Sequence, residues 1–189
     1  VYLKNDIDLT GAEFEPIPIF SGEFDGRGYS IKGFKISSSK QTGIFNVIGE
    51  TGRVYNLNVS GNISYTGNKE GLGGIAIINK GRILSCNFCG KLKGNSKVGG
   101  IAGENDVTGE IIDCSVKGSI LGEHSVGGIA GINEGSIKNT KNFSDINRVN
   151  QEKISTVEDM DFGAIPDIRR FRITEPLNTL TDIGGISGL

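Results

Sequence analysis

Short apolar runs alternate with glycine, asparagine and aspartate along most of the chain, and the pattern recurs at a nearly fixed interval. The run Leu72-Gly73-Gly74-Ile75-Ala76 returns at Val98 and again at Val126, in steps of 26 and 28 residues. Each copy is followed by an asparagine, by a Gly-x-Ile segment and by a closing segment in which Gly or Ser precedes Leu or Ile by two positions. β-Branched residues favour strands, whereas glycine and asparagine favour turns with positive φ. Such a unit buries its apolar face only against copies of itself, so the repeat predicts a β-solenoid.

The alignment of the copies predicts four rows of inward side chains, stacked at the spacing of neighbouring strands, about 4.8 Å. Short polar residues at one shared position fall between two of these rows and are expected at a corner of the coil, where they can bond the turning backbone. The alternative of a helical repeat is disfavoured, because glycine costs about 1 kcal/mol in a helix interior. The rows are Ile44-Ile75-Ile101-Ile129, Val54-Ile83-Ile111-Ile137, Leu57-Cys86-Cys114-Thr140 and Ile63-Leu92-Ile120-Ile146, and the corner residues are Asn56, Ser85, Asp113 and Asn139.

Four segments follow from where the repeat holds and where it breaks. Residues 1–41 are expected to form head coils and a cap, in which Phe14, Phe20 and Phe24 cover the open end of the stack. Residues 42–146 hold the repeat coils, each of 26–30 residues with about three short strands. Residues 147–181 form an irregular C-terminal excursion, in which Ser155 and Glu158 indicate a short helix. Residues 182–189 resemble the start of a further coil.

The residues of the repeat also carry a family resemblance. Val98-Gly99-Gly100-Ile101-Ala102-Gly103-x-Asn105, followed by Gly109-x-Ile111-x-Asp113-Cys114, resembles the GLUG motif of bacterial surface proteins and of the N-terminal region of immunoglobulin A protease-type metallopeptidases. The head, with Phe24-Asp25-Gly26, resembles the segment that precedes such repeats. The resemblance implies a right-handed parallel β-helix, secretion and an extracellular or cell-surface location. Departures include Ile77-Ile78 in place of Gly-x and Thr140 in place of cysteine.

Composition narrows the function classes. The chain of 189 residues has 20 Lys+Arg against 22 Asp+Glu, a balance that gives no support to binding of nucleic acid or a bilayer surface. No apolar run reaches the roughly 20 residues of a membrane-spanning helix. The 30 glycines follow no three-residue period, so a collagen-like chain is excluded. The chain opens without an initiator methionine, and we expect it to be part of a longer polypeptide.

Few residues suggest chemistry. His124 is the only histidine, lies in a polar turn and cannot form the His-Glu-x-x-His pair of a zinc peptidase. Cys86 and Cys89 form a lone Cys-x-x-Cys; stacking of Cys86 on Cys114 as small buried side chains is favoured over a disulfide or a metal site. Asp6, Asp8 and Asp25 are weak candidates for calcium ligands. No cofactor and no catalytic residue are predicted.

The densest charge cluster is the remaining candidate, as a ligand surface. It lies in the excursion, where carboxylates alternate with arginines that could serve a polysaccharide site or simply pair on the surface; its candidate residues are Asp167, Arg169, Arg170 and Arg172.

Three functions are compatible with this sequence. The first is a non-catalytic structural or adhesive module that displays loops to a host or cell-wall glycan or protein. The second is a β-helix enzyme that acts on polysaccharide, and the third is an accessory segment of a larger surface metallopeptidase.

Overall fold

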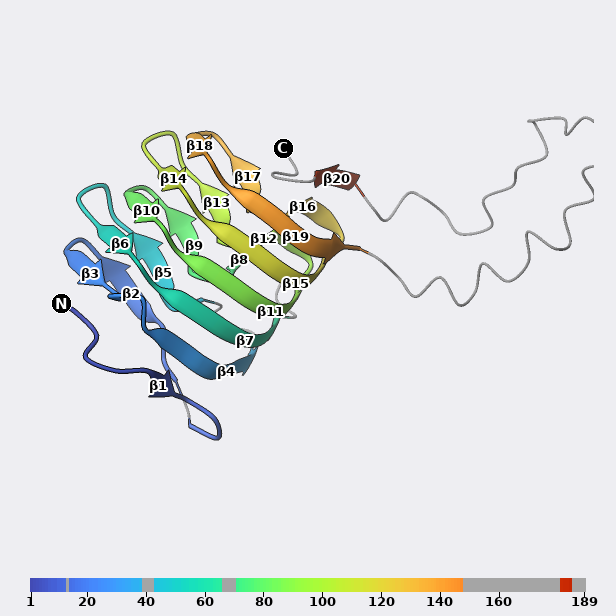
Figure 1. The fold of residues 1–189 in the computed structure, drawn as a ribbon. Helices are drawn as coiled ribbons and strands as arrows, with labels where there is room; N and C mark the ends of the chain where they lie inside the picture. Colours follow the sequence, from blue (N-terminus) through green and yellow to red (C-terminus); the bar gives the residue numbers. More distant parts are fainter. Residues whose placement is uncertain (13, 39–42, 66–70, 148–180, 185–189) are drawn as a thin grey trace, which may run out of the picture.

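The computed structural model describes residues 1–12, 14–38, 43–65, 71–147 and 181–184. Its repeating unit is a coil that crosses four parallel sheets in turn, which we number 1 to 4 in the order in which the chain visits them. In one coil these strands are β8 (Leu72–Gly73), β9 (Ala76–Asn79), β10 (Arg82–Leu84) and β11 (Asn87–Lys93). Figure 1 shows the coils stacked along one axis, with equivalent strands side by side.

The remaining strands occupy the same four sheets. Sheet 1 contains β8, β12 (Ser96–Gly99), β16 (His124–Gly127) and β20 (Thr181–Gly184), and sheet 2 contains β2 (Ile17–Phe20), β5 (Phe45–Ile48), β9, β13 (Ala102–Asn105) and β17 (Ala130–Asn133). Sheet 3 contains β3 (Glu23–Asp25), β6 (Arg53–Tyr55), β10, β14 (Glu110–Ile112) and β18 (Ser136–Lys138). Sheet 4 contains β1 (Ile7–Asp8), β4 (Ser30–Ser38), β7 (Asn58–Tyr65), β11, β15 (Ser115–Leu121) and β19 (Lys141–Ile146).

The all-β solenoid predicted from the repeat is confirmed, and one detail is corrected. A full coil has four strands rather than about three, because the run around the glycine pair is divided. Gly74 and Ile75 lie in a bend between β8 and β9, so the run contributes to two sheets. A Cβ on Gly74 would lie 2.4 Å from the carbonyl oxygen of Gly100 and from Cδ2 of Phe88. The bend therefore leaves no room for a side chain at that position.

The predicted inward rows form the core. Val54, Ile83 and Ile111 are fully buried and are direct neighbours in sheet 3, and Ile63, Leu92 and Ile120 are neighbours in sheet 4. The sequence pattern did not single out two further buried rows, which are Val59-Phe88-Val116 in sheet 4 and Leu72-Val98-Val126 in sheet 1. A fully buried aliphatic side chain contributes roughly 1.5–3 kcal/mol, so these rows hold the coils together.

The corner between sheets 3 and 4 also follows the prediction. Asn56, Ser85, Asp113 and Asn139 have φ of 53°, 50°, 54° and 52°, so each turns the chain in the left-handed region. Immediately after this corner, Leu57, Cys86 and Cys114 point into the core and are almost fully buried. A single polar residue thus redirects the chain at the same place in each coil.

The two ends of the stack differ. At the N-terminal end Phe24 heads the buried row of sheet 3, and Phe20, Phe24 and Phe45 form an aromatic cluster with ring centroids 5.1–6.3 Å apart. Phe14 and Phe20 are partly buried against the core, as expected of a cap. At the other end Ile183 and Gly184 of β20 lie opposite Val126 and Gly127, the register of a further coil. The helix predicted at Ser155 lies outside the described residues.

Candidate functional site: a polar groove between sheets 3 and 4

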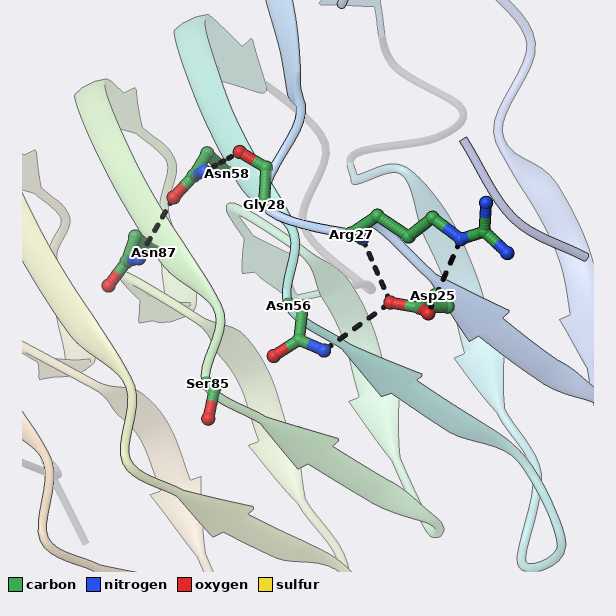
Figure 2. Close-up of a pocket in the computed structure, with 7 residues that line it drawn as sticks. All are labelled: Asp25, Arg27, Gly28, Asn56, Asn58, Ser85 and Asn87. Carbon is green, nitrogen blue, oxygen red and sulfur yellow. Dashed lines mark hydrogen bonds and ion pairs between the residues drawn. The ribbon is translucent and has the colours of Figure 1, made fainter. Parts of the chain in front are cut away.

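A shallow hollow of about 530 Å³ lies on the outside of the corner where the chain passes from sheet 3 to sheet 4. Its lining comes from three successive coils and is almost wholly polar. Figure 2 shows the seven lining residues along the turns that follow β3, β6 and β10: Asp25, Arg27, Gly28, Asn56, Asn58, Ser85 and Asn87.

One wall of the groove is a ladder of side-chain hydrogen bonds that runs across the coils. The Asn58 side-chain amide donates to the Gly28 carbonyl at 2.8 Å, and the Asn87 amide donates to Oδ1 of Asn58 at 2.9 Å. The Ser115 hydroxyl continues the ladder by donating to Oδ1 of Asn87 at 2.5 Å. These residues are the first outward positions of their strands, so the register of sheet 4 brings them together.

The opposite wall is built on Asp25. Its carboxylate accepts from the Arg27 backbone N–H at 2.8 Å and from the Asn56 amide at 3.3 Å, and its second oxygen lies 3.8 Å from Nε of Arg27. The guanidinium of Arg27 in turn lies 3.7 Å from the centroid of the Tyr2 ring, a cation–π contact. Asp25 therefore shapes the turn, and several donors hold it in place.

A second hollow of about 420 Å³ lies on the sheet 3 side of the same corner and shares Asn56 and Ser85 with the groove. Its charged side chains are paired across neighbouring strands. Arg53 lies 3.3 Å from Glu23, and Arg82 forms a hydrogen-bonded ion pair with Glu110. The hydrogen bond from Arg82 lowers the pKa of the Glu110 carboxyl.

The calcium candidates are not gathered into one site. Asp6 accepts from the Lys32 side chain and the Ser30 backbone, whereas Asp8 accepts from the Thr10 side chain and, at 2.8 Å, from the Thr10 backbone. These hydrogen bonds lower the pKa of both carboxyls. Among the residues that the structure describes, no cluster of three histidine, cysteine or acidic side chains could hold a metal ion.

Neither the cysteines nor the histidine line the groove. Cys86 and Cys114 are free and buried, and each thiol donates to a backbone carbonyl two residues earlier, at 3.3 and 3.2 Å. Burial raises the pKa of both thiols, to about 11 for Cys114. Cys89 is exposed on the outer face of β11, so Cys86 and Cys89 point to opposite sides of the strand and cannot bind one metal ion. His124 is exposed and begins β16 rather than lying in a turn.

The charged cluster predicted as a ligand surface, Asp167, Arg169, Arg170 and Arg172, lies outside the described residues. The groove itself was only half anticipated. The sequence places Asn56 and Ser85 at one corner, but it does not bring Asp25 and Arg27 to them. The signal that could have done so is Gly26-x-Gly28, which marks a longer turn at the same corner in the head coil.

Chemically, the groove presents amide, hydroxyl and carbonyl groups that recur from one coil to the next. Such groups recognise hydroxyl-rich or amide-rich ligands through hydrogen bonds, provided that they exchange water for the ligand without loss. The described part of the chain contains no helix long and apolar enough to pass through a bilayer.

With this geometry established, comparison with known proteins identifies the repeat. Residues 94–121 match the model of the family described as the GLUG motif. The chain carries a GLUG motif. The matched GLUG segment covers β12 to β15, one whole coil, so the resemblance inferred from the sequence is confirmed.

Two proteins are similar to this GLUG chain. Halomucin from Haloquadratum walsbyi is 34% identical over 91 residues, which are 47% of this chain but 1% of halomucin. The crystal structure of a candidate immunoglobulin A1 protease from Bacteroides ovatus superposes with a TM-score of 0.55 at 24% identity, over 77% of this chain and 59% of that one. The latter shows a shared fold, and the chain spans less than two thirds of either protein.

Proposed function

We propose that this chain is a non-catalytic structural and adhesive module of a secreted or cell-surface protein, and that its outer flanks bind host or cell-wall ligands. The observation that carries the proposal is the groove between sheets 3 and 4. Its polar side chains are fixed by one another and by the backbone of neighbouring coils, so the stack presents them at little further cost in conformational entropy.

The comparisons support a surface location. Part of this chain is 34% identical to a segment of halomucin, whose name describes a mucin, and the fold is shared with a candidate immunoglobulin A1 protease. The small fraction of halomucin that is matched agrees with a repeat module used inside long chains. The same solved structure favours a second candidate, an accessory segment of a surface peptidase, in which the solenoid would place a separate catalytic domain near its substrate.

The groove gives a polysaccharide-cleaving site no support. General acid–base cleavage of a glycosidic bond uses two carboxyl groups on either side of the bond. Asp25 is the acidic side chain of the groove lining, and three donor groups from Arg27 and Asn56 already engage it. The geometry therefore supports binding better than cleavage.

A binding screen tests the proposal. The native chain is applied to a glycan array and to immobilised host-matrix proteins, beside the double substitution Asn58→Ala and Asn87→Ala in the groove. A matched control carries Asn5→Ala and Thr108→Ala, two exposed polar residues away from the groove. We expect saturable binding that the groove variant weakens at least about tenfold and the control leaves within about threefold. Turnover of a bound glycan or peptide by the native chain would contradict the proposal.

A further inference from the structure

The outer face of sheet 4 gathers lysines that lie far apart in the sequence. In β11 the residues Asn87, Cys89, Lys91 and Lys93 are exposed and alternate with buried or partly buried positions. Lys117 of β15 and Lys141 of β19 are exposed on the same face. The three strands are neighbours, as Figure 1 shows, so four lysines lie on one surface formed by residues 87–146.

The register fixes how these side chains are arranged. Lys117 lies between Cys89 and Phe143 in one outward row, and Ser119 lies between Lys91 and Asp145 in the next. Lys141 ends the row that begins at the groove ladder, beside Ser115. Neighbouring strands are about 4.8 Å apart, so Lys117 and Lys141 lie one and two strand spacings from the strand that carries both Lys91 and Lys93. The small residues between them leave the face open.

The positive charge on this face is not neutralised as it is elsewhere. The ion pairs of the described part of the chain engage Arg27, Lys32, Arg53, Lys80, Arg82 and Lys97. None of these pairs includes Lys91, Lys93, Lys117 or Lys141. Among the described residues of the sheet, the acidic ones lie on its edge strands: Asp145 on β19, in the outward row of Lys91 and Ser119, and Asp8 on β1 at the opposite edge, where Asp6 directly precedes the strand. A compact positive field on a chain with net charge −2 attracts anions to this face in particular.

An exposed aromatic side chain completes the surface. The side chain of Phe143 is 67% exposed, although phenylalanine is usually buried, and it lies next to Lys117. The flat ring can pack against the apolar C–H face of a sugar ring, while neighbouring ammonium groups pair with sulfate or carboxylate substituents. A ring and several lysines on one open face therefore match a charged sugar chain.

We propose that the outer face of sheet 4 binds an acidic polysaccharide through Lys91, Lys93, Lys117 and Lys141, with Phe143 as the stacking platform. The inference rests on the proposed function of a binding module and names its ligand class and surface. A nucleic acid fits less well, because the face offers one aromatic ring for stacking and no arginine for bidentate contacts to phosphate. The polar groove at the neighbouring corner remains a separate surface for neutral ligands.

The test measures affinity of the native chain for heparin, polygalacturonate, neutral dextran and single-stranded DNA at low and high salt. The face variant combines Lys91→Gln, Lys93→Gln and Lys117→Gln, and the control variant combines Lys4→Gln, Lys80→Gln and Lys138→Gln, which removes the same charge elsewhere. We expect at least about a tenfold loss of heparin or polygalacturonate affinity in the face variant and less than about threefold in the control. Phe143→Ala should weaken binding severalfold without changing its salt dependence.

The outcomes separate this inference from the proposed function. Equal losses of heparin or polygalacturonate affinity in the two triple variants would overturn an acidic-glycan site on this face. DNA binding as tight as heparin binding would overturn it as well. Binding of neutral glycans or matrix proteins without binding of acidic glycans would overturn the inference but leave the binding module standing. Absence of binding to all of these ligands would overturn both. Circular dichroism of each variant checks that the stack remains folded.

Discussion

Sheets 3 and 4 are neighbouring flanks of the same solenoid, but their outward charged side chains are arranged differently. On sheet 3 one outward row reads Glu23, Arg53, Arg82, Glu110 and Ser136, and its charges pair across adjacent strands. On sheet 4 the lysines of β11, β15 and β19 lie opposite uncharged residues of the neighbouring strands and remain outside the ion pairs of the described chain. Stacking thus neutralises one flank and leaves the other positive.

The contrast shows how parallel stacking determines which outward side chains become neighbours. Because each outward position is repeated at the strand spacing, a residue meets the same position of the next coil rather than its neighbours along the chain. Opposite charges at that position stabilise the stack, and like charges at nearby positions create a binding surface at a small cost. Sheet 3 therefore serves cohesion, whereas we assign ligand binding to sheet 4 and to the corner between the two.

The largest expected effect concerns the glycine row in the strands of sheet 4, which the strands of sheet 3 lack. A Cβ on Gly90 would lie 1.8 Å from the carbonyl oxygen of Gly61, so Gly90→Ala should lower the free energy of unfolding by about 3 kcal/mol or more. Gly22→Ala, just before β3 of sheet 3, is the matched control, because its Cβ would meet nothing closer than 3.6 Å. Urea denaturation measures both, and equal stability of the two variants would contradict the packing described for sheet 4.

The thiols separate the outer face of sheet 4 from its interior. At mildly alkaline pH Cys89 should react with iodoacetamide in the native state, while Cys86 and Cys114 react only after unfolding. Burial raises the Cys114 pKa from 9.0 to about 11, which lowers its thiolate fraction about a hundredfold. Mass spectrometry of labelled peptides measures each site, and rapid native labelling of all three would show that the interior is open.

On the other side of sheet 3, a buried amide ladder joins it to sheet 2. Asn105 accepts from the Asn79 amide at 2.7 Å and donates to Oδ1 of Asn133 at 2.8 Å and to the Gly109 carbonyl at 3.2 Å. Asn105→Ala leaves buried partners unpaired and should cost about 2 kcal/mol in urea denaturation. Asn95→Ala, at a partly buried turn, is the comparison, and a smaller loss at Asn105 than at Asn95 would contradict the role of the ladder.

The smallest expected effect is the acid sensitivity of the sheet 3 ion pair. Because Arg82 lowers the folded-state pKa of Glu110, the stabilisation is complete above the ordinary glutamate pKa and is lost as the pH falls through the lowered value. Glu110→Gln should therefore flatten the fall in urea midpoint between about pH 5 and pH 3. Lys117→Gln on sheet 4 should leave that slope unchanged, because Lys117 takes part in none of the carboxylate ion pairs of the described chain. If the urea midpoint falls equally with pH in the native chain and in both variants, the ion pair of sheet 3 does not distinguish it from sheet 4.

The sequence predicts the interior of this fold better than its exterior. Aligned copies of the repeat place Ile83 under Ile111 and Cys86 under Cys114, because buried positions tolerate few residue types and the pattern persists from coil to coil. The division of the glycine run into two strands was missed, because it arises from a backbone bend at Gly74 and Ile75 that no change in polarity marks.

The lysine face was missed for a different reason. Lys91, Lys93 and Lys117 are up to 26 residues apart and look scattered in the linear sequence. Only the register of β11 with β15, and the alternation of exposed and buried positions within each strand, place them together. Comparing every second residue along each strand of the aligned coils, which gives the outward rows, is the signal that could have found them.

Lysine footprinting of the native chain tests the central claim most directly, because it compares both flanks in one experiment. Acetylation rates are measured residue by residue, by mass spectrometry, with and without saturating heparin. The account predicts that heparin slows modification of Lys91, Lys93, Lys117 and Lys141 and leaves Lys4, Lys80 and Lys138 at their original rates. Equal protection of all seven lysines, or protection of Lys4, Lys80 and Lys138 alone, would contradict the assignment of sheet 4 as the binding face.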